Sequence, residues 1–165
     1  MSTPNPLSHI DATGKATMVA VGEKPITPRM ARAEGFVVIS DDLEKRIREN
    51  SLEKGSLLEV ARMAGIMAAK RTDTLIPLCH SLPLDHVDVT ATLERGRVRI
   101  EACVRVHART GVEMEALTAV AIACVAVIDM GKAVDRWMRV DGIRMIEKHG
   151  GRSGSWKAEA AREPA

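Results

Sequence analysis

Asp129 and Lys132 are the first residues whose types and spacing could do chemistry. They stand three residues apart in a segment predicted to be helical, so their side chains share one helix face. On many helices such a pair is only a solvated surface ion pair. Here it follows the apolar run AVAIACVAVI (119–128), and a partly desolvated Lys–Asp pair has coupled, shifted pKa values. We therefore predict that this pair transfers protons as a general acid and base.

A second group, Leu78-Cys79-His80, lies in an apolar segment, 73–84, that two prolines keep from being helical. A structural reading makes Cys79 a small hydrophobe and His80 a hydrogen-bonded core residue. Covalent catalysis by the Cys–His pair is disfavoured, because adjacent residues rarely orient toward each other as nucleophile and base. An apolar loop with fixed shape favours a pocket wall that contacts a ligand through His80 and the loop backbone.

Two carboxylates, Glu113 and Glu115, open the predicted helix that ends near Asp129. Acidic residues in a first helical turn already suit the helix dipole, which is an alternative explanation for both. Because they are two residues apart, they point in different directions, so one can face a pocket. An ionised carboxylate there can accept hydrogen bonds from the N1–H and 2-amino group of a guanine edge.

Scattered cations complete the candidate set. Taken singly, each is a solvated charge, whereas convergence of several makes a polyphosphate site. They are Arg29, Lys54, Lys70, Arg71, Lys132, Lys148 and Arg152. The chain has no Walker sequence and no GxGxxG, so the usual nucleotide-binding loops are not indicated. Its histidines and cysteines are dispersed, and we expect no metal site.

The strands are predicted from β-branched residues and period-two alternation. Short strands are expected at 17–21 and 35–40, with a proline-marked loop carrying Arg29 between them. Alternation is clearest in a hairpin formed by 87–93 and 98–106, whose inward set in the second strand begins at Val98.

Helical spacing predicts helices at 42–49 and 56–71, followed after the hairpin by a buried helix at 112–134 and a strand at 138–147. Gly65 weakens the second helix, which predicts a close contact with another helix at that point.

The resulting order is βαββαβ, the ferredoxin-like pattern of an α+β fold in which an antiparallel sheet packs against helices, here with N-terminal additions. We expect a flexible N-terminus at 1–8, one catalytic domain at 9–154 and a flexible tail at 155–165.

Composition excludes several other classes. Aromatic residues make up 2% of the 165 residues and the net charge is +2, which disfavours a nucleic-acid binder that stacks bases or tracks phosphates. The three cysteines form no CxxC pair. We see no signal peptide and no apolar run of membrane-spanning length, so we expect a cytoplasmic protein without a membrane partner.

The candidate segments, taken together, resemble the MoaC family. The resemblance covers about residues 8–155 and is carried by HID (9–11), KGSLLEVARMAGIMAAKRT (54–72), KRTDTLIPLCHSLPL (70–84), TGVEMEALTAV (110–120), IDMGKAVD (128–135) and EKHGGRSG (147–154). It implies a lyase of molybdenum-cofactor biosynthesis that converts 3′,8-cyclo-7,8-dihydroguanosine 5′-triphosphate into cyclic pyranopterin monophosphate and releases pyrophosphate. It also implies a ferredoxin-like fold, no cofactor, and a homohexamer, a trimer of dimers, with active sites at subunit interfaces.

The resemblance also assigns roles to individual positions. The positions matching the family's catalytic residues are Asp129, Lys132 and Lys54. Those matching substrate-contacting positions are Leu78, Cys79, His80, Met114 and Glu115, and those in segments lining the same pocket are Glu113, Lys70, Lys148 and Arg29.

Two positions depart from the family pattern. Gly131 stands where many relatives carry Cys, and Ser81 stands where Pro is usual. Neither change removes a charged group from the proposed chemistry. Two alternatives stay open: a ferredoxin-like RNA-binding or regulatory module, and a degenerate relative that binds the nucleotide without turnover.

Overall fold

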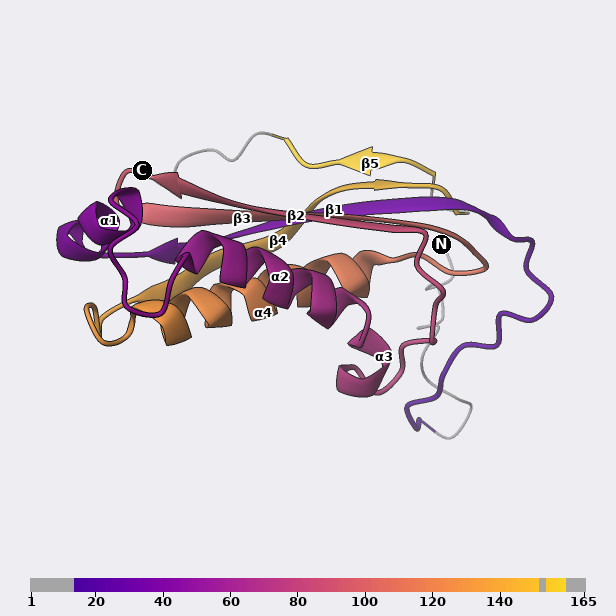
Figure 1. Cartoon of the computed structure of the whole chain (residues 1–165). Coiled ribbons are helices and arrows are strands. Elements are labelled where there is room, and N and C mark those ends of the chain that lie inside the picture. The colour runs from indigo at the N-terminus through magenta and orange to yellow at the C-terminus, as the bar shows by residue number, and fades with distance from the viewer. Residues whose placement is uncertain (1–13, 152–153, 160–165) are drawn as a thin grey trace.

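A five-stranded antiparallel sheet forms one layer of the molecule, and its helices cover one face (Figure 1). The computed structural model describes residues 14–151 and 154–159. The expected flexible N-terminus, His9, Asp11 and Arg152 lie outside the described residues. The elements are β1 (Thr27–Val38), α1 (Asp41–Arg48), α2 (Leu57–Ala69), α3 (Thr72–Leu75), β2 (His86–Glu94), β3 (Arg97–Ala108), α4 (Glu113–Gly131), β4 (Arg139–His149) and β5 (Trp156–Lys157).

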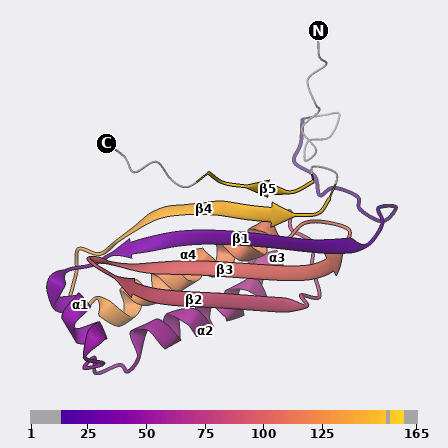
Figure 2. The ribbon, with the colours of Figure 1, turned by 90° about the horizontal axis from the view of Figure 1, so that it is seen from above.

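The strand order is β2-β3-β1-β4-β5, with β1 antiparallel to both β3 and β4. Seen from above the sheet, this order is laid out across the view, and α2 and α4 lie side by side beneath it (Figure 2). The first four strands in the order therefore have the ferredoxin-like arrangement, which confirms the predicted fold class.

The hairpin confirms the alternation read from the sequence. Val87 of β2 pairs with Val104 of β3, and Glu94 pairs with Arg97 across a turn in which Gly96 has a φ of +72°. The inward set of β3 packs into the core because side chains two residues apart point to the same face. It comprises Val98, Ile100, Ala102, Val104 and Val106, all buried.

The first strand differs from its prediction. Residues 17–21 form no strand, and β1 starts at Thr27, inside the expected proline loop, rather than at Gly35. Pro28 is exposed near the start of β1, a position where a missing backbone N–H is tolerated. Pairing with β3 along its whole length makes β1 longer than its local sequence predicts.

The helix contact predicted at Gly65 is present. A Cβ at this position would lie 2.9 Å from the Ala119 carbonyl oxygen of α4, so only glycine lets α2 approach this closely. Helix α4 itself is long and apolar enough to span a membrane by length and composition alone. More than half of its most apolar stretch is buried in the fold, where it packs on the sheet and on α2, as the core helix of a two-layer protein does.

The outer face of the sheet carries a buried carboxylate. Glu34 on β1 accepts hydrogen bonds from Arg144 at 2.7 Å and from Arg99 at 2.9 Å. Burial alone would raise the pKa of Glu34, but the two arginines outweigh it and hold that pKa below its usual value. The carboxylate is therefore ionised and ties β1 to strands on both sides.

Strand β5 was not predicted. It falls in the segment expected to be a flexible tail and pairs with β4, Glu147 opposite Lys157 and Lys148 opposite Trp156. His149 at the end of β4 also contacts Ser155 at 2.8 Å. The chain thus turns back after β4 and adds a short antiparallel strand to the edge of the sheet.

Candidate active site

The candidate residues gather at the two ends of α4. Asp129 and Lys132 lie at its carboxyl end, beside α1, and Glu113 and Glu115 lie at its amino end, beside α3 (Figure 1). With a rise of 1.5 Å per residue, Glu113 and Asp129, which are sixteen positions apart, lie about 24 Å from each other along the helix. We call Lys54, Asp129 and Lys132 the carboxyl-end group. The amino-end group is Lys70, Leu78, Cys79, His80, Glu113, Met114, Glu115 and Lys148.

Asp129 is the centre of the carboxyl-end group. Lys132 donates a hydrogen bond to its Oδ1 at 2.7 Å, as the spacing of three residues predicted. Lys54 donates to the main-chain oxygen of Asp129 at 2.9 Å, and its Nζ lies 3.6 Å from Oδ2. The hydrogen bond from Lys132, followed by the charges of Lys132 and Lys54, lowers the pKa of Asp129. One carboxylate therefore sits between two cations.

The desolvation expected for this pair is wrong for the single chain. The side chains of Asp129 and Lys132 are each 60% exposed, and that of Lys54 is 48% exposed. The apolar run before Asp129 is buried, but the helix has emerged from the core by the time the chain reaches these charges. Strong proton-transfer coupling at this point requires something further to cover the group.

Lys54 reaches Asp129 from the loop between α1 and α2. Gly55 follows it with a φ of +87°, and Ser56 then caps α2 by accepting a hydrogen bond from the Glu59 N–H. The lysine lines a hollow of about 370 Å³ against the end of α4, together with Met130 and others. This contact joins residues 75 positions apart in the chain, and no local spacing could have revealed it.

The amino-end group, apart from Lys70 and Lys148, lines a hollow of about 460 Å³. Three segments converge there, and their lining residues are Val19, Val21, Lys24, Leu78, Cys79, His80, Leu82, Thr110, Gly111, Glu113, Met114 and Glu115. Nε2 of His80 lies 2.9 Å from the Val19 carbonyl oxygen, which makes Nε2 the protonated nitrogen. A second hollow of about 400 Å³ adjoins it through His80, Leu82 and Glu115, and includes Lys70. The structure thus brings the predicted pocket wall together with the predicted carboxylates.

Glu115 is the buried carboxyl of this hollow, only 4% exposed. Burial, reinforced by the charges of Glu113 and Asp73, raises its pKa to about 7, although its own backbone N–H acts in the opposite direction. Near neutral pH this group both accepts and donates hydrogen bonds. Burial, with the charges of Glu115 and Asp73, also raises the pKa of the Cys79 thiol, which disfavours a thiolate nucleophile.

Glu113 faces a different partner. Its Oε1 lies 2.8 Å from Nζ of Lys148, which comes from the end of β4. Beyond Lys148 the chain turns through Gly150 and Gly151, with φ values of +90° and +85°. A Cβ on Gly151 would overlap Nη1 of Arg29, so the glycines let this turn close over the arginine at the start of β1.

Sequence reasoning missed two residues of these hollows, Asp73 and Lys24. Asp73 on α3 accepts a hydrogen bond from Ser81, and its charge acts on both Cys79 and Glu115. Lys24 lines the hollow, and its carbonyl oxygen accepts from Arg109 at 3.0 Å. Asp73 could have been found from the sequence, because it is the first residue of the apolar segment 73–84. Nothing in the sequence marks Lys24. Among residues 14–151 and 154–159, no group of three or more His, Cys, Asp or Glu residues could hold a metal ion.

Comparison with known proteins decides the family. The model of the MoaC family matches residues 18–151. The chain belongs to the MoaC family. A relative from Methylobacterium sp. (strain 4-46) is 55% identical over 157 residues, covering 94% of this chain and 98% of the relative. Relatives from Parvibaculum lavamentivorans and Thermomicrobium roseum are 52% and 55% identical over 155 residues, covering 93% of this chain and 97% and 93% of the relatives. All three relatives carry the name cyclic pyranopterin monophosphate synthase.

Proposed function

We propose that this chain catalyses the cyclic pyranopterin monophosphate synthase reaction of molybdenum-cofactor biosynthesis. The substrate is 3′,8-cyclo-7,8-dihydroguanosine 5′-triphosphate, and the products are cyclic pyranopterin monophosphate and pyrophosphate. The observation that carries the proposal is the carboxylate of Asp129 held between Lys54 and Lys132, in a member of the MoaC family. Such a group supplies both a proton-transfer pair and positive charge for a phosphate leaving group.

The carboxyl-end group provides the chemistry. Ring opening and reclosure of the purine part require protons to be moved on and off nitrogen, and the Asp129–Lys132 pair does this. The cyclic phosphate closes when a sugar hydroxyl attacks the α-phosphorus and the bond to pyrophosphate breaks. The ammonium groups of Lys54 and Lys132 stabilise the negative charge that develops on the leaving group.

The amino-end group binds the substrate. Glu115 and Glu113 accept hydrogen bonds from the guanine-derived ring, and Leu78, Cys79, His80 and Met114 form its wall. Three further cations act on the phosphates: Lys70, Lys148 and Arg29. Lys148 begins the reaction cycle paired with Glu113, so on substrate binding Lys148 exchanges a carboxylate partner for a phosphate.

The active site is shared between two copies of the chain. Within one chain the two groups are about 24 Å apart along α4, too far for one nucleotide to contact both closely. Pairing the carboxyl end of one chain with the amino end of another brings the groups together and covers the exposed Asp129. This supports active sites at subunit interfaces in a homohexamer, a trimer of dimers.

An exposed apolar face of the helix layer fits the same assembly. Three side chains spaced three and four residues apart on α2 are exposed: Val60, Met63 and Met67. Ile122 and Val125 of α4 are exposed as well, Val125 by 56%. Apolar surface of this kind is characteristic of obligate contacts between identical subunits.

We further propose a cytoplasmic enzyme that works without a cofactor or metal and binds neither nucleic acid nor membrane.

A turnover assay tests the activity. The purified protein is incubated with the cyclised dihydro-GTP substrate, without reductant, and pyrophosphate and pterin are both measured. We expect both products, and their loss in Asp129→Asn with the protein still folded. If the substrate binds without forming either product, the chain is a binding protein, and the proposed activity is wrong.

Mixing two inactive variants tests the shared site. Asp129→Asn and Glu115→Ala change different groups, so a mixed dimer contains one site with both groups intact. Random assembly restores about a quarter of wild-type activity. Each variant reassembled alone is the matched control and stays inactive. Mixed assemblies that also stay inactive would place both groups in one chain's own site.

A further inference from the structure

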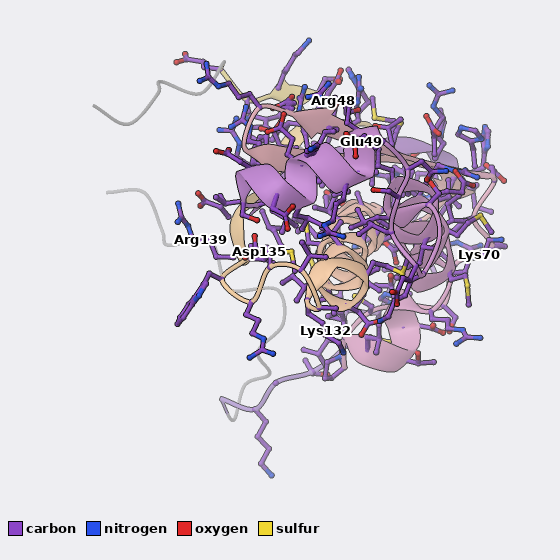
Figure 3. All side chains as sticks on the ribbon, turned by 60° about the vertical axis from the view of Figure 1, so that its left-hand side comes forward. Arg48, Glu49, Lys70, Lys132, Asp135 and Arg139 are labelled. Atoms are coloured by element: carbon purple, nitrogen blue, oxygen red, sulfur yellow. The ribbon has the colours of Figure 1, made fainter. Side chains whose placement is uncertain are left out.

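Asp135 is a buried carboxylate just beyond the carboxyl-end group. It is 7% exposed and lies in the turn that follows α4, between the end of that helix and α1 (Figure 3). Its own N–H donates to the Gly131 carbonyl oxygen at 3.0 Å, which continues the helix into the turn. The same view shows Lys132 nearby, at the end of α4.

Both carboxylate oxygens of Asp135 accept hydrogen bonds from main-chain donors. Oδ2 accepts from the N–H of Ser40 at 2.7 Å, and Oδ1 accepts from the N–H of Trp137 at 2.9 Å. Ser40 is the cap residue of α1, with its hydroxyl accepting from the Leu43 N–H. The side chain therefore joins the last turn of α4 to the first turn of α1.

The placement of α1 in turn determines where Lys54 lies. Leu43 of α1 packs on Gly131 so closely that a Cβ there would lie 2.7 Å from its Cδ2. The chain leaves α1 after Arg48 and reaches Lys54 six residues later, where the ammonium group contacts Asp129. Lys132, by contrast, is the C-cap residue of α4 and reaches Asp129 from the same helix end, without α1.

We infer that Asp135 is a positioning residue, which holds α1 against the end of α4 so that Lys54 meets Asp129. The inference rests on the proposed function, because the contact matters only if the carboxyl-end group does the chemistry. The inference predicts that the position of Lys54 depends on Asp135, whereas the position of Lys132 does not.

Labelling of lysines tests this independently of activity. The intact protein is treated briefly with an amine-reactive reagent, and the modification of Lys54 and Lys132 is quantified by mass spectrometry. In Asp135→Asn one N–H loses its acceptor, so labelling of Lys54 rises severalfold relative to Lys132. Ser40→Ala is the matched control: it removes the α1 cap hydroxyl but keeps the main-chain N–H bound to Asp135, and the ratio stays at its wild-type value.

The outcomes separate positioning from general destabilisation. Loss of overall stability would raise labelling at both lysines together. An unchanged ratio in Asp135→Asn overturns the inference, as does an equal change in Ser40→Ala. If Asp135→Asn is not recovered folded, Asp135→Ser keeps one acceptor in a smaller side chain, and the same change in ratio is expected of it.

Kinetics complete the test. We expect Asp135→Asn to lower kcat about tenfold with KM within about twofold of wild type, because the displaced lysine belongs to the reacting end of the site. In a Lys54→Ala background the same substitution has little further effect on kcat, since its target is already gone. Additive losses would contradict the assignment. Absence of turnover in the wild type would refute the proposed function instead, and the labelling ratio would still report on Asp135.

Discussion

Replacing Glu115 with Gln tests the ionisation of the buried carboxyl in the amino-end hollow. The carboxyl is 4% exposed, and its pKa is raised from an ordinary 4.5 to about 7, first by burial and then by Glu113 and Asp73. A carboxyl whose pKa is raised on folding binds its proton more tightly in the folded state. Stability is therefore lost as pH rises from 4.5 through about 7, where Glu115 must ionise inside the fold.

The magnitude follows from the size of the pKa change. One pKa unit corresponds to about 1.4 kcal/mol, so raising the value from 4.5 to about 7 makes ionisation of Glu115 cost about 3 kcal/mol. Glu115→Gln has nearly the same shape and no charge to bury. Relative to this variant, the wild type should lose about 3 kcal/mol of unfolding free energy between pH 4.5 and pH 8.

Urea unfolding at a series of pH values measures the difference. Protein concentration is kept equal throughout, because subunit association shifts apparent stability. Glu113→Gln is the comparison variant: the Glu113 carboxylate contributes to the raised pKa of Glu115, so without that charge the loss of stability above pH 4.5 becomes smaller. Parallel pH curves for wild type and Glu115→Gln would refute the reasoning, since they would show that Glu115 titrates alike in the folded and unfolded states.

Three further predictions address packing, the charged sheet face and the loop that carries Ser81. Gly65→Ala should destabilise the protein by about 2 kcal/mol despite better helix propensity, because the new Cβ would lie 2.9 Å from the Ala119 carbonyl oxygen; a higher melting temperature would contradict this. Glu34→Gln should lower the free energy of unfolding by about 2 kcal/mol at pH 7 and by less at lower pH, because a carboxylate with a lowered pKa stabilises the fold only while it is ionised. An equal decrease at pH 7 and pH 3, measured by urea unfolding, would be inconsistent with this prediction. Ser81→Ala breaks the hydrogen bond to Asp73 and should raise KM by about threefold to tenfold with kcat nearly unchanged; steady-state kinetics showing a fall in kcat alone would argue against a role in binding.

Much of the fold could be predicted because its signals are local. Apolar and polar residues alternate strictly along the hairpin strands. Gly65 has low helix propensity, and its presence in α2 is explained by the close contact with α4. The start of β1 at Thr27 could not be read in this way. Its length comes from pairing with β3, and the strand continues through a proline because the missing N–H lies at an exposed position.

Part of the candidate site could be predicted as well. The spacing of Asp129 and Lys132 predicted their hydrogen bond, because side chains three residues apart on a helix lie on the same face. The apolar segment around His80 was predicted to form a pocket wall, and it lines the amino-end hollow. The expected desolvation of Asp129 failed for the single chain, since sequence shows that an apolar run precedes a charge but not where the helix leaves the core.

The sequence by itself determined the fold class, the family and which types of group are candidates for the chemistry. Only the tertiary structure decided which of those groups meet. Lys54 and Asp129 touch across 75 residues, and Asp135 reaches the cap of α1 across 95. Such contacts depend on how whole helices and strands pack against one another. That packing is set by side-chain shapes and main-chain donors that are far apart in the chain, so local residue types and spacing do not reveal it. The same packing places the two candidate groups at opposite ends of α4, a separation that the spacing of their residues in the sequence does not reveal.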